Sequence, residues 1–295
     1  MISTNQISLT APSLLHLGCL WAGQVCELGL ALQHPQIQLA ARAAPSLEVS
    51  GACAETALDE AERLIAKYHQ PLPVSVEIET AIPTQMGLGS EAMMRASLWR
   101  VYSQWHTVTG SFRMTLAEHV AQHGGLILAD DEGLIQRRVE LPHDCADDQD
   151  DWVFVMLLPD EPEDLPAGLD IRRIAALRKS VRPHLGWPDG AALFAAAEQY
   201  DFAGFAHALA AIHAINEQAL GIPLTTETQT ALALLRDNGA AMCGQMLTGL
   251  GLFGLIKGGP ASRELRTALQ NHYGYSGLLI LASVCAGAGI RMSPL

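Results

Sequence analysis

Lysine is scarce in this 295-residue sequence, which contains only Lys67, Lys179 and Lys257, so arginine supplies most of the positive charge. Charged residues make up only 17% of the chain and aromatic residues 5%, whereas hydrophobic residues make up 49%. That hydrophobic content is enough for a folded core and excludes a disordered chain. The net charge of −13 opposes approach to phosphate backbones, so we expect no nucleic-acid partner.

Long hydrophobic runs are also absent. The most apolar stretch, 246–256, contains several glycines and is shorter than the about 18 residues that a membrane-spanning helix needs. The amino-terminal segment carries no basic region and no clear signal-peptidase site. We therefore expect a cytoplasmic protein that has no membrane partner.

The cysteines form no Cys-x-x-Cys pair, and none lies at zinc-finger spacing from a histidine, which argues against structural zinc or a disulfide framework. We expect reduced thiols in apolar surroundings, with Cys243, beside a glycine loop, as the candidate for reactive-thiol chemistry. His119 and His123 share a helix face, but no third metal ligand is evident, so we expect no metal site built from protein ligands. The other cysteines are Cys19, Cys26, Cys53, Cys145 and Cys285.

The first half of the sequence predicts short strands and turns followed by helices. Before residue 50, brief apolar runs predict strands that Pro12, Gly18 and the His34-Pro35 turn interrupt. An acidic, turn-rich segment at 143–151 has no periodicity and predicts a linker, so we place a domain boundary near residue 148. The elements expected between these points are helices at 55–68, 91–105 and 114–123, a strand at 74–79, and a hairpin of strands 126–129 and 134–139.

The second half predicts strands that alternate with helices. Helices laid on one face of a sheet give an α+β domain. The expected elements are strands at 152–158, 252–256 and 278–284 and helices at 171–181, 190–220, 225–238 and 263–272.

A glycine-rich turn, Met86-Gly87-Leu88-Gly89-Ser90, joins the strand at 74–79 to the helix at 91–105. Two glycines spaced by one residue let the backbone approach an anion, and the unsatisfied N–H groups and dipole of the first helical turn favour negative charge. Ser90 can cap the helix and donate to a phosphate oxygen. The pattern matches neither a P-loop nor a Rossmann fingerprint. It predicts an anion-binding helix N-terminus or, if it binds no ligand, a tight strand-to-helix turn.

The segment Pro83-x-x-x-Gly87-Leu88-Gly89-Ser90 resembles the PxxxGLGSS phosphate loop of the GHMP kinase superfamily. Within that superfamily, the chain is most similar to the beta-ribofuranosylaminobenzene 5'-phosphate synthase family. The segments that carry this similarity, in order, are APSLLHLG at 11–18, HGGLIL at 123–128, DWVFV at 151–155 with Pro159, and Gly244-Gln245 ahead of Gly249, where the family has a second Gly- and Ser-rich loop.

The resemblance implies an α+β fold of two domains with the ligand in the cleft between them. Residues 1–148 would form a domain like ribosomal protein S5 domain 2, and residues 149–295 a ferredoxin-like domain. The implied reaction condenses phosphoribosyl pyrophosphate with 4-aminobenzoate or 4-hydroxybenzoate, with loss of CO₂ and pyrophosphate, on the path to a methanopterin-type cofactor. The expected partner is a phosphorylated small molecule, with Mg²⁺ as the implied ion and no organic cofactor; a homodimer is one expected assembly.

The resemblance also implies roles for particular residues. His16, on the opening strand, and Arg113, which matches an arginine of the family, are implied as catalytic. Taken alone, His16 also fits a hydrogen-bonded core histidine. The implied phosphate-binding set is Gly87, Leu88, Gly89, Ser90, Glu91, Arg95, Gly244, Gln245, Thr248 and Gly249, although an arginine such as Arg95 also fits a surface ion pair.

Departures from the family patterns leave two other functions open. Glu91 stands where kinases repeat serine, and its carboxylate would repel a triphosphate unless Mg²⁺ lies between them. Met246 and Leu247 replace serines of the second loop, which removes two hydroxyl donors. The aspartate that kinases carry before the Gly-Gly pair has no counterpart in 115–122. The alternatives are a GHMP small-molecule kinase that uses Mg-ATP and a non-catalytic relative that binds a ligand.

Overall fold

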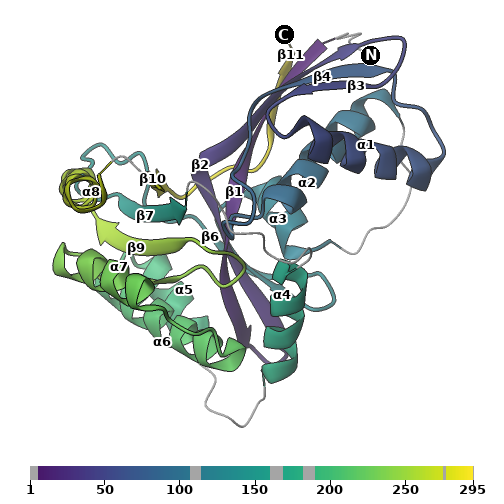
Figure 1. Ribbon diagram of the computed structural model, residues 1–295. Helices are drawn as coiled ribbons and strands as arrows, with labels where there is room; N and C mark the ends of the chain where they lie inside the picture. The colour runs from purple at the N-terminus through teal and green to yellow at the C-terminus, as the bar shows by residue number, and fades with distance from the viewer. Residues whose placement is uncertain (1–5, 107–113, 160–168, 182–189, 275–276, 295) are drawn as a thin grey trace.

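The computed structural model describes residues 6–106, 114–159, 169–181, 190–274 and 277–294. Two β-sheets and their covering helices build an α+β fold (Figure 1). The elements in chain order are β1 (Gln6–Trp21), β2 (Val25–Ala43), β3 (Glu48–Gly51), α1 (Ala54–Tyr68), β4 (Val74–Thr80), α2 (Ser90–Trp105), α3 (Leu116–His123), β5 (Leu126–Asp130), β6 (Ile135–Val139), β7 (Trp152–Pro159), α4 (Leu169–Ser180), α5 (Gly190–Glu198), α6 (Phe202–Leu220), α7 (Thr226–Asp237), β8 (Met242–Gln245), β9 (Leu252–Lys257), α8 (Gly259–Tyr273), β10 (Leu278–Val284) and β11 (Arg291–Pro294).

A long hairpin of β1 and β2 runs through the whole molecule (Figure 1). The expectation of several short strands before residue 50 is therefore wrong. Pro12 and Gly18 do not end β1, because each lies at a shift of the strand register, where an irregular residue is tolerated. The His34-Pro35 turn lies inside β2: residues 33–36 bulge out between the paired positions Leu32 and Ile37.

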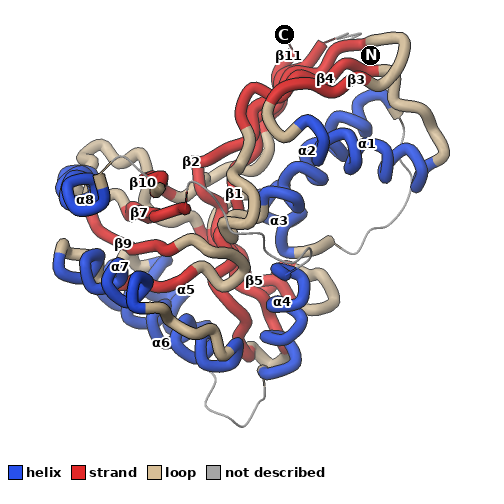
Figure 2. The backbone as a smooth tube through the Cα atoms, viewed as in Figure 1, coloured by secondary structure: helices blue, strands red, loops and turns tan. Residues whose placement is uncertain are grey.

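Within the described residues the larger sheet has seven strands, in the order β11-β1-β2-β4-β3, and β5 and β6 extend it beside β2. The length of β2 explains this branching, because its residues 38–43 pair with β4 while its residues 26–30 pair with β5. Figure 2 shows α1, α2 and α3 together on one side of this sheet. Alternate residues of β4 are buried, as the period-two pattern at 74–79 predicts.

The smaller sheet is antiparallel, with the strand order β10-β7-β9-β8. This order, with α7 and α8 packed against the strands, is the ferredoxin-like arrangement that we expected. All seven apolar residues of β7 before Pro159 are buried, which explains their continuous run in the sequence.

The helix expected over 190–220 is two helices, α5 and α6. Tyr200 adopts a left-handed backbone conformation (φ 57°), which ends the first helix. Asp201 then caps the second, because its carboxylate accepts a hydrogen bond from the Gly204 N–H at 3.0 Å. The aspartate was the available sequence signal for this break, but the alanine-rich flanks obscured it.

Three short strands, β3, β8 and β11, were not expected from the sequence. They have four residues each, which is too short for a periodic pattern. β11 pairs with β1, so the last described residues of the chain complete the larger sheet. The boundary expected near residue 148 falls in the loop between β6 and β7, and it remains a prediction.

All six cysteines are free, and Cys19, Cys26 and Cys285 are buried as expected, whereas Cys53 is exposed and does not lie in apolar surroundings. Burial raises the pKa of Cys19 and Cys285 to about 12, which keeps both thiols protonated. Burial also raises the pKa of Cys243, which argues against the reactive thiol considered there. No helix in the described ranges is long and apolar enough to cross a membrane.

Candidate functional site

The glycine loop joins β4 to α2, and α2 begins at Ser90 as the sequence predicts. Gly87 and Gly89 have φ of 87° and 68°, a left-handed conformation that favours glycine. Gly89 is the N-cap of α2 and has no side chain, so no side-chain cap covers the first-turn N–H groups. Glu91 lies exposed in this same first turn. The first turn of α2 therefore has no side-chain cap, and an uncapped helix N-terminus is the kind of backbone arrangement that binds anions.

The second loop, residues 246–251, lies directly on the glycine loop. The backbone N–H of Leu250 donates to the Gln85 carbonyl at 3.1 Å, and that of Gly251 donates to the Met86 carbonyl at 3.2 Å. The Thr248 hydroxyl donates to the Gly87 carbonyl at 3.4 Å. The structure therefore brings together the two loops that sequence reasoning selected separately.

Buried apolar side chains hold these loops in place. Met86, Leu88, Met246 and Leu247 are each at most 2% exposed. Met246 and Leu247, which stand where the resembling family has serines, thus belong to the core rather than to a ligand surface. From β1, the Leu14 N–H donates to the Leu88 carbonyl at 3.0 Å. The polar groups near the junction include backbone N–H groups and the side chains of Ser90, Glu91 and Thr248, which are not buried.

Arg173, on α4, is a residue that sequence reasoning missed. Its Nη1 donates to the Gly249 carbonyl at 3.2 Å, which brings a cation to the meeting point of the loops. No carboxylate in the described parts of the chain lies within ion-pair distance of it. Burial lowers the pKa of Arg173, so the desolvated cation gains from an anionic partner. Only the tertiary position of α4 distinguishes it from other arginines.

Arg95 points toward α1 rather than to the glycine loop. Its Nε donates to Glu60 Oε2 at 3.0 Å and its Nη2 to Glu60 Oε1 at 3.3 Å. The hydrogen bond to Glu60 raises the pKa of Arg95, and Arg63 contacts the same carboxylate at 2.6 Å. In this arrangement Arg95 joins α1 to α2.

Gly244 and Gln245 lie on β8 and contact α6. A Cβ on Gly244 would lie 2.3 Å from His213 Cε1, so the glycine makes room for the imidazole ring. His213 Nε2 forms a hydrogen bond with the Gln245 carbonyl at 2.9 Å, and Glu217 Oε1 accepts a hydrogen bond from the Gln245 N–H at 3.3 Å. These contacts position the strand that leads into the second loop.

His16 lies on β1 and is buried, at 4% exposure. Its Nε2 lies 3.3 Å from Glu27 Oε2, and Arg178 of α4 forms an ion pair with the same carboxylate. The ring therefore belongs to a buried polar cluster beneath α4. Arg113, the other residue implied as catalytic, lies outside the described residues.

The described residues contain no group of three His, Cys, Asp or Glu side chains that could hold a metal ion. A Mg²⁺ that arrives with substrate phosphates keeps several waters and needs few protein ligands. The Ser90 hydroxyl and the Glu91 carboxylate, both in the first turn of α2, are oxygen donors of the kind this ion prefers. The residues at the loop thus fit a phosphate-bound Mg²⁺ but not a cage built from the protein alone.

Comparison with known proteins identifies the fold. No protein-family model and no curated protein matches the chain. Homoserine kinase from Cytophaga hutchinsonii matches at 14% identity over 99% of both chains, with a TM-score of 0.63. A 4-(cytidine 5'-diphospho)-2C-methyl-D-erythritol kinase matches at 18% identity over 95% of this chain and 100% of that chain, with a TM-score of 0.65. MDDEF in complex with MVAPP, AMPPCP and magnesium matches at 15% identity over 98% and 99%, with a TM-score of 0.65.

The chain has the two-domain α+β fold of the GHMP kinases. This confirms the fold expected from the glycine loop. Identities of 14–18% establish the architecture alone, and substrate and reaction depend on the particular residues that this chain carries at the site.

Proposed function

We propose that this protein is a beta-ribofuranosylaminobenzene 5'-phosphate synthase or a divergent relative, which condenses phosphoribosyl pyrophosphate with a 4-amino- or 4-hydroxybenzoate. The order of the four similar sequence segments supports this reaction. The observation that carries the proposal is Arg173, a cation without a carboxylate partner among the described residues. It contacts Gly249, in the loop that packs against the uncapped N-terminus of α2.

In this proposal the chain's own groups bind and hold the phosphorylated ribose. Backbone N–H groups at the start of α2, the Ser90 hydroxyl and the Arg173 guanidinium bind phosphate oxygens. The bond from ribose C1 to pyrophosphate breaks, and C1 bonds to the ring carbon that carries the carboxylate, which leaves as CO₂. Donors that stabilise the departing pyrophosphate lower the barrier, because positive charge develops on the sugar as negative charge leaves. A bound Mg²⁺ would supply further charge neutralisation for pyrophosphate.

The test is incubation of the purified protein with phosphoribosyl pyrophosphate, 4-aminobenzoate carrying a labelled carboxylate, and Mg²⁺. The proposal expects release of labelled CO₂ and pyrophosphate in equal amounts. Calorimetry with each substrate separately measures binding when turnover is slow. Absence of both turnover and binding of either substrate would refute the proposal.

A second candidate is a small-molecule kinase that uses Mg-ATP, which the full-length likeness to kinases favours. Against it, the described part of 115–122 contains no aspartate before the Gly-Gly pair, and Glu91 opposes a triphosphate. Calorimetric titration with Mg-ATP separates the two candidates, since the synthase proposal requires no ATP site. Binding of ATP in preference to phosphoribosyl pyrophosphate would favour the kinase.

The third hypothesis is a non-catalytic relative that binds a ligand, and the close packing of the second loop on the glycine loop favours it. Gly249 fills the space at Gly87, so a ligand must be bound at the rim of the loops unless they separate. Binding of phosphoribosyl pyrophosphate without any CO₂ release would support this reading over the synthase.

A further inference from the structure

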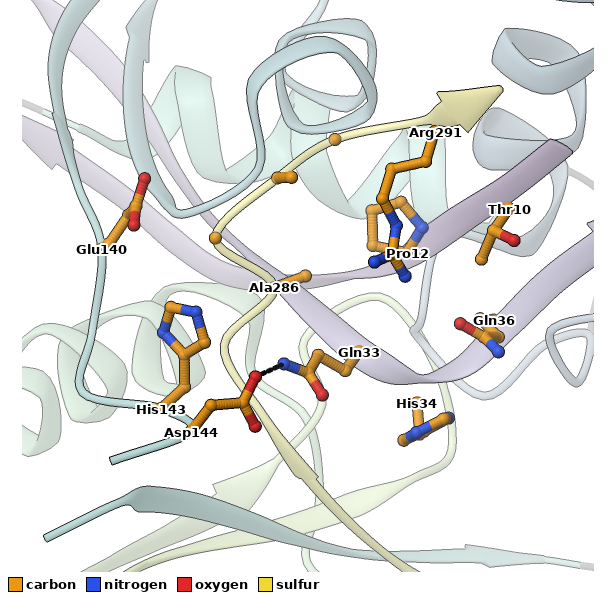
Figure 3. A pocket seen from close by; sticks show the side chains of 13 residues that line it. Thr10, Pro12, Gln33, His34, Gln36, Glu140, His143, Asp144, Ala286 and Arg291 are labelled. Atoms are coloured by element: carbon orange, nitrogen blue, oxygen red, sulfur yellow. Dashed lines mark hydrogen bonds between the residues drawn. The ribbon is translucent and has the colours of Figure 1, made fainter. Parts of the chain in front are cut away.

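A cavity of about 560 Å³ lies away from the glycine loops, between the bulge of β2 and the segments 140–144 and 286–289 (Figure 3). Neither glycine loop contributes a residue to its lining. Its wall is bonded to the carboxyl end of α3 and the turn that follows: Ile290 N–H donates to the Ala121 carbonyl at 2.6 Å, and Gly125 N–H to the Ala286 carbonyl at 2.7 Å. The cavity is therefore separate from the candidate site, whose loops meet at the start of α2.

Arg138 fixes the wall of this cavity and neutralises one of its acids. Its Nη2 lies 2.7 Å from the Gly287 carbonyl, 2.7 Å from Glu140 Oε1 and 2.9 Å from the His123 carbonyl. These bonds tie β6, the carboxyl end of α3 and the 286–289 segment together. A ligand therefore meets a largely preformed wall, which reduces the ordering cost of binding.

One side of the cavity presents hydrogen-bond acceptors. Gln33 Nε2 donates to Asp144 Oδ2 at 3.4 Å and to the Cys285 carbonyl at 3.5 Å, which leaves Gln33 Oε1 as an acceptor. His143 Nδ1 lies 2.7 Å from the Leu141 carbonyl, so Nδ1 donates this hydrogen bond and Nε2 is the ring nitrogen left for a ligand. No cation in the described ranges pairs with Asp144. These groups suit a positively charged donor.

The opposite side of the cavity presents donors. Arg291 of β11 lies directly across from Thr10 of β1 in the strand register. Figure 3 shows both residues on the side of the cavity away from Asp144 and His143. Within the described parts of the chain, no carboxylate forms an ion pair with Arg291. A guanidinium fork and a hydroxyl together suit a carboxylate.

We propose that this cavity binds a small zwitterion with one carboxylate and one ammonium group, the chemistry of free amino acids and dipeptides. Arg291 and Thr10 would hold the carboxylate, while Asp144, His143 and Gln33 would accept the ammonium hydrogens. The two unpaired charges of opposite sign lie apart across one cavity, so a ligand with a single charge would satisfy only one of them. The apolar lining is limited to small groups such as Pro12 and Ala286, which favours a small or polar side chain.

The first test uses the unaltered protein and blocked ligands. Glycine, L-serine, L-glutamine and glycylglycine are measured by calorimetry and ligand-observed NMR, each beside its N-acetylated and carboxamide forms. At least one free zwitterion should bind, and blocking either end should weaken it by about tenfold or more, because each block removes a charge-assisted contact. Failure of all four to bind overturns the proposal, as does equal binding of the blocked forms.

The second test assigns the two ends of the ligand to the two sides. Arg291→Gln should abolish the preference for the acid over the amide form, and Asp144→Asn the preference for the amine over the acetylated form. Arg42→Gln and Asp59→Asn, which change exposed residues elsewhere, are the matched controls and should leave both preferences intact. If inorganic phosphate binds and loses affinity in Arg291→Gln while no zwitterion does, the cavity is a simple anion site and the proposal fails.

Discussion

A Cβ atom on Gly249 would lie 2.0 Å from the backbone nitrogen of Gly87, so the two glycines meet with no space for a side chain between them. One belongs to the loop before α2 and the other to the loop between β8 and β9. The candidate anion site therefore exists only when the two halves of the chain are folded against each other. Substitutions in either of these two loops can therefore test whether the loops bind an anion.

Gly89→Val should abolish anion binding and lower the free energy of unfolding by about 2–4 kcal/mol. The new Cβ would lie 2.9 Å from Leu14 Cβ, and the residue would be held at φ 68°. Gly221→Val is the matched control, because Gly221 has φ 60° but no atom within 4 Å of its Cβ position. Denaturant unfolding and phosphoribosyl pyrophosphate titration of both variants measure the effects. Equal losses in the two variants would mean that crowding at Leu14 is unimportant.

Glu91→Ser should tighten the binding of inorganic phosphate or phosphoribosyl pyrophosphate by up to about tenfold, and more at low salt than at high salt, because it removes an exposed negative charge beside the site. Glu55→Gln, in the first turn of α1, controls for the change in net charge. A Mg²⁺ titration completes the experiment. Weaker binding in Glu91→Ser that appears only with Mg²⁺ present would show that the carboxylate helps to hold the ion.

Arg173→Gln should weaken the binding of the same anions by about tenfold or more, because it removes a partly desolvated cation at the loops. Its stability should change little, because the guanidinium makes one hydrogen bond to a carbonyl in the described structure. Lys179→Gln, near the end of the same helix, is the control. Unchanged affinity in Arg173→Gln would remove the main support for the proposed function.

Glu217 should make stability depend on pH in the acidic range. Burial acts to raise the pKa of Glu217, but the hydrogen bond and charge of His213 and the Gln245 N–H lower it below 4.5 overall. Because the folded pKa is lower than the unfolded one, the ionised group stabilises the fold above about pH 4.5 and loses this effect as the pH falls through the folded pKa. Glu217→Gln should flatten the acid dependence of the unfolding free energy by up to about 1 kcal/mol. Glu264→Gln, an exposed acid on α8, should leave it unchanged.

The local elements were largely predictable because their signals are local. The Thr115 and Glu118 side chains form the capping box that starts α3, and Asp130 accepts from Glu132 N–H and Leu134 N–H to close the β5–β6 turn. The glycine loop was predictable for the same reason, since Gly87 and Gly89 adopt conformations that favour glycine.

Contacts between distant segments were not predictable from those signals. Nothing near Arg173 in the sequence indicates that α4 reaches the Gly249 carbonyl, and nothing near Arg95 shows that a buried Glu60 pairs with it. The β1–β2 hairpin was misjudged because Pro12 and Gly18 ordinarily interrupt strands, whereas here the partner strand absorbs both in register shifts. Whether an arginine reaches the candidate site therefore depends on its tertiary partner, which the local sequence does not indicate.

The pairing of β11 with β1 also covers a strand edge that would otherwise be available to pair with strands of other molecules. β1 carries a long row of backbone donors and acceptors, and β11 covers part of its outer edge at residues 7–10. A chain cut in the loop before β7 would retain β1 but lose this cover. Its uncovered edge could then recruit strands from other molecules, so the amino-terminal half expressed alone should self-associate.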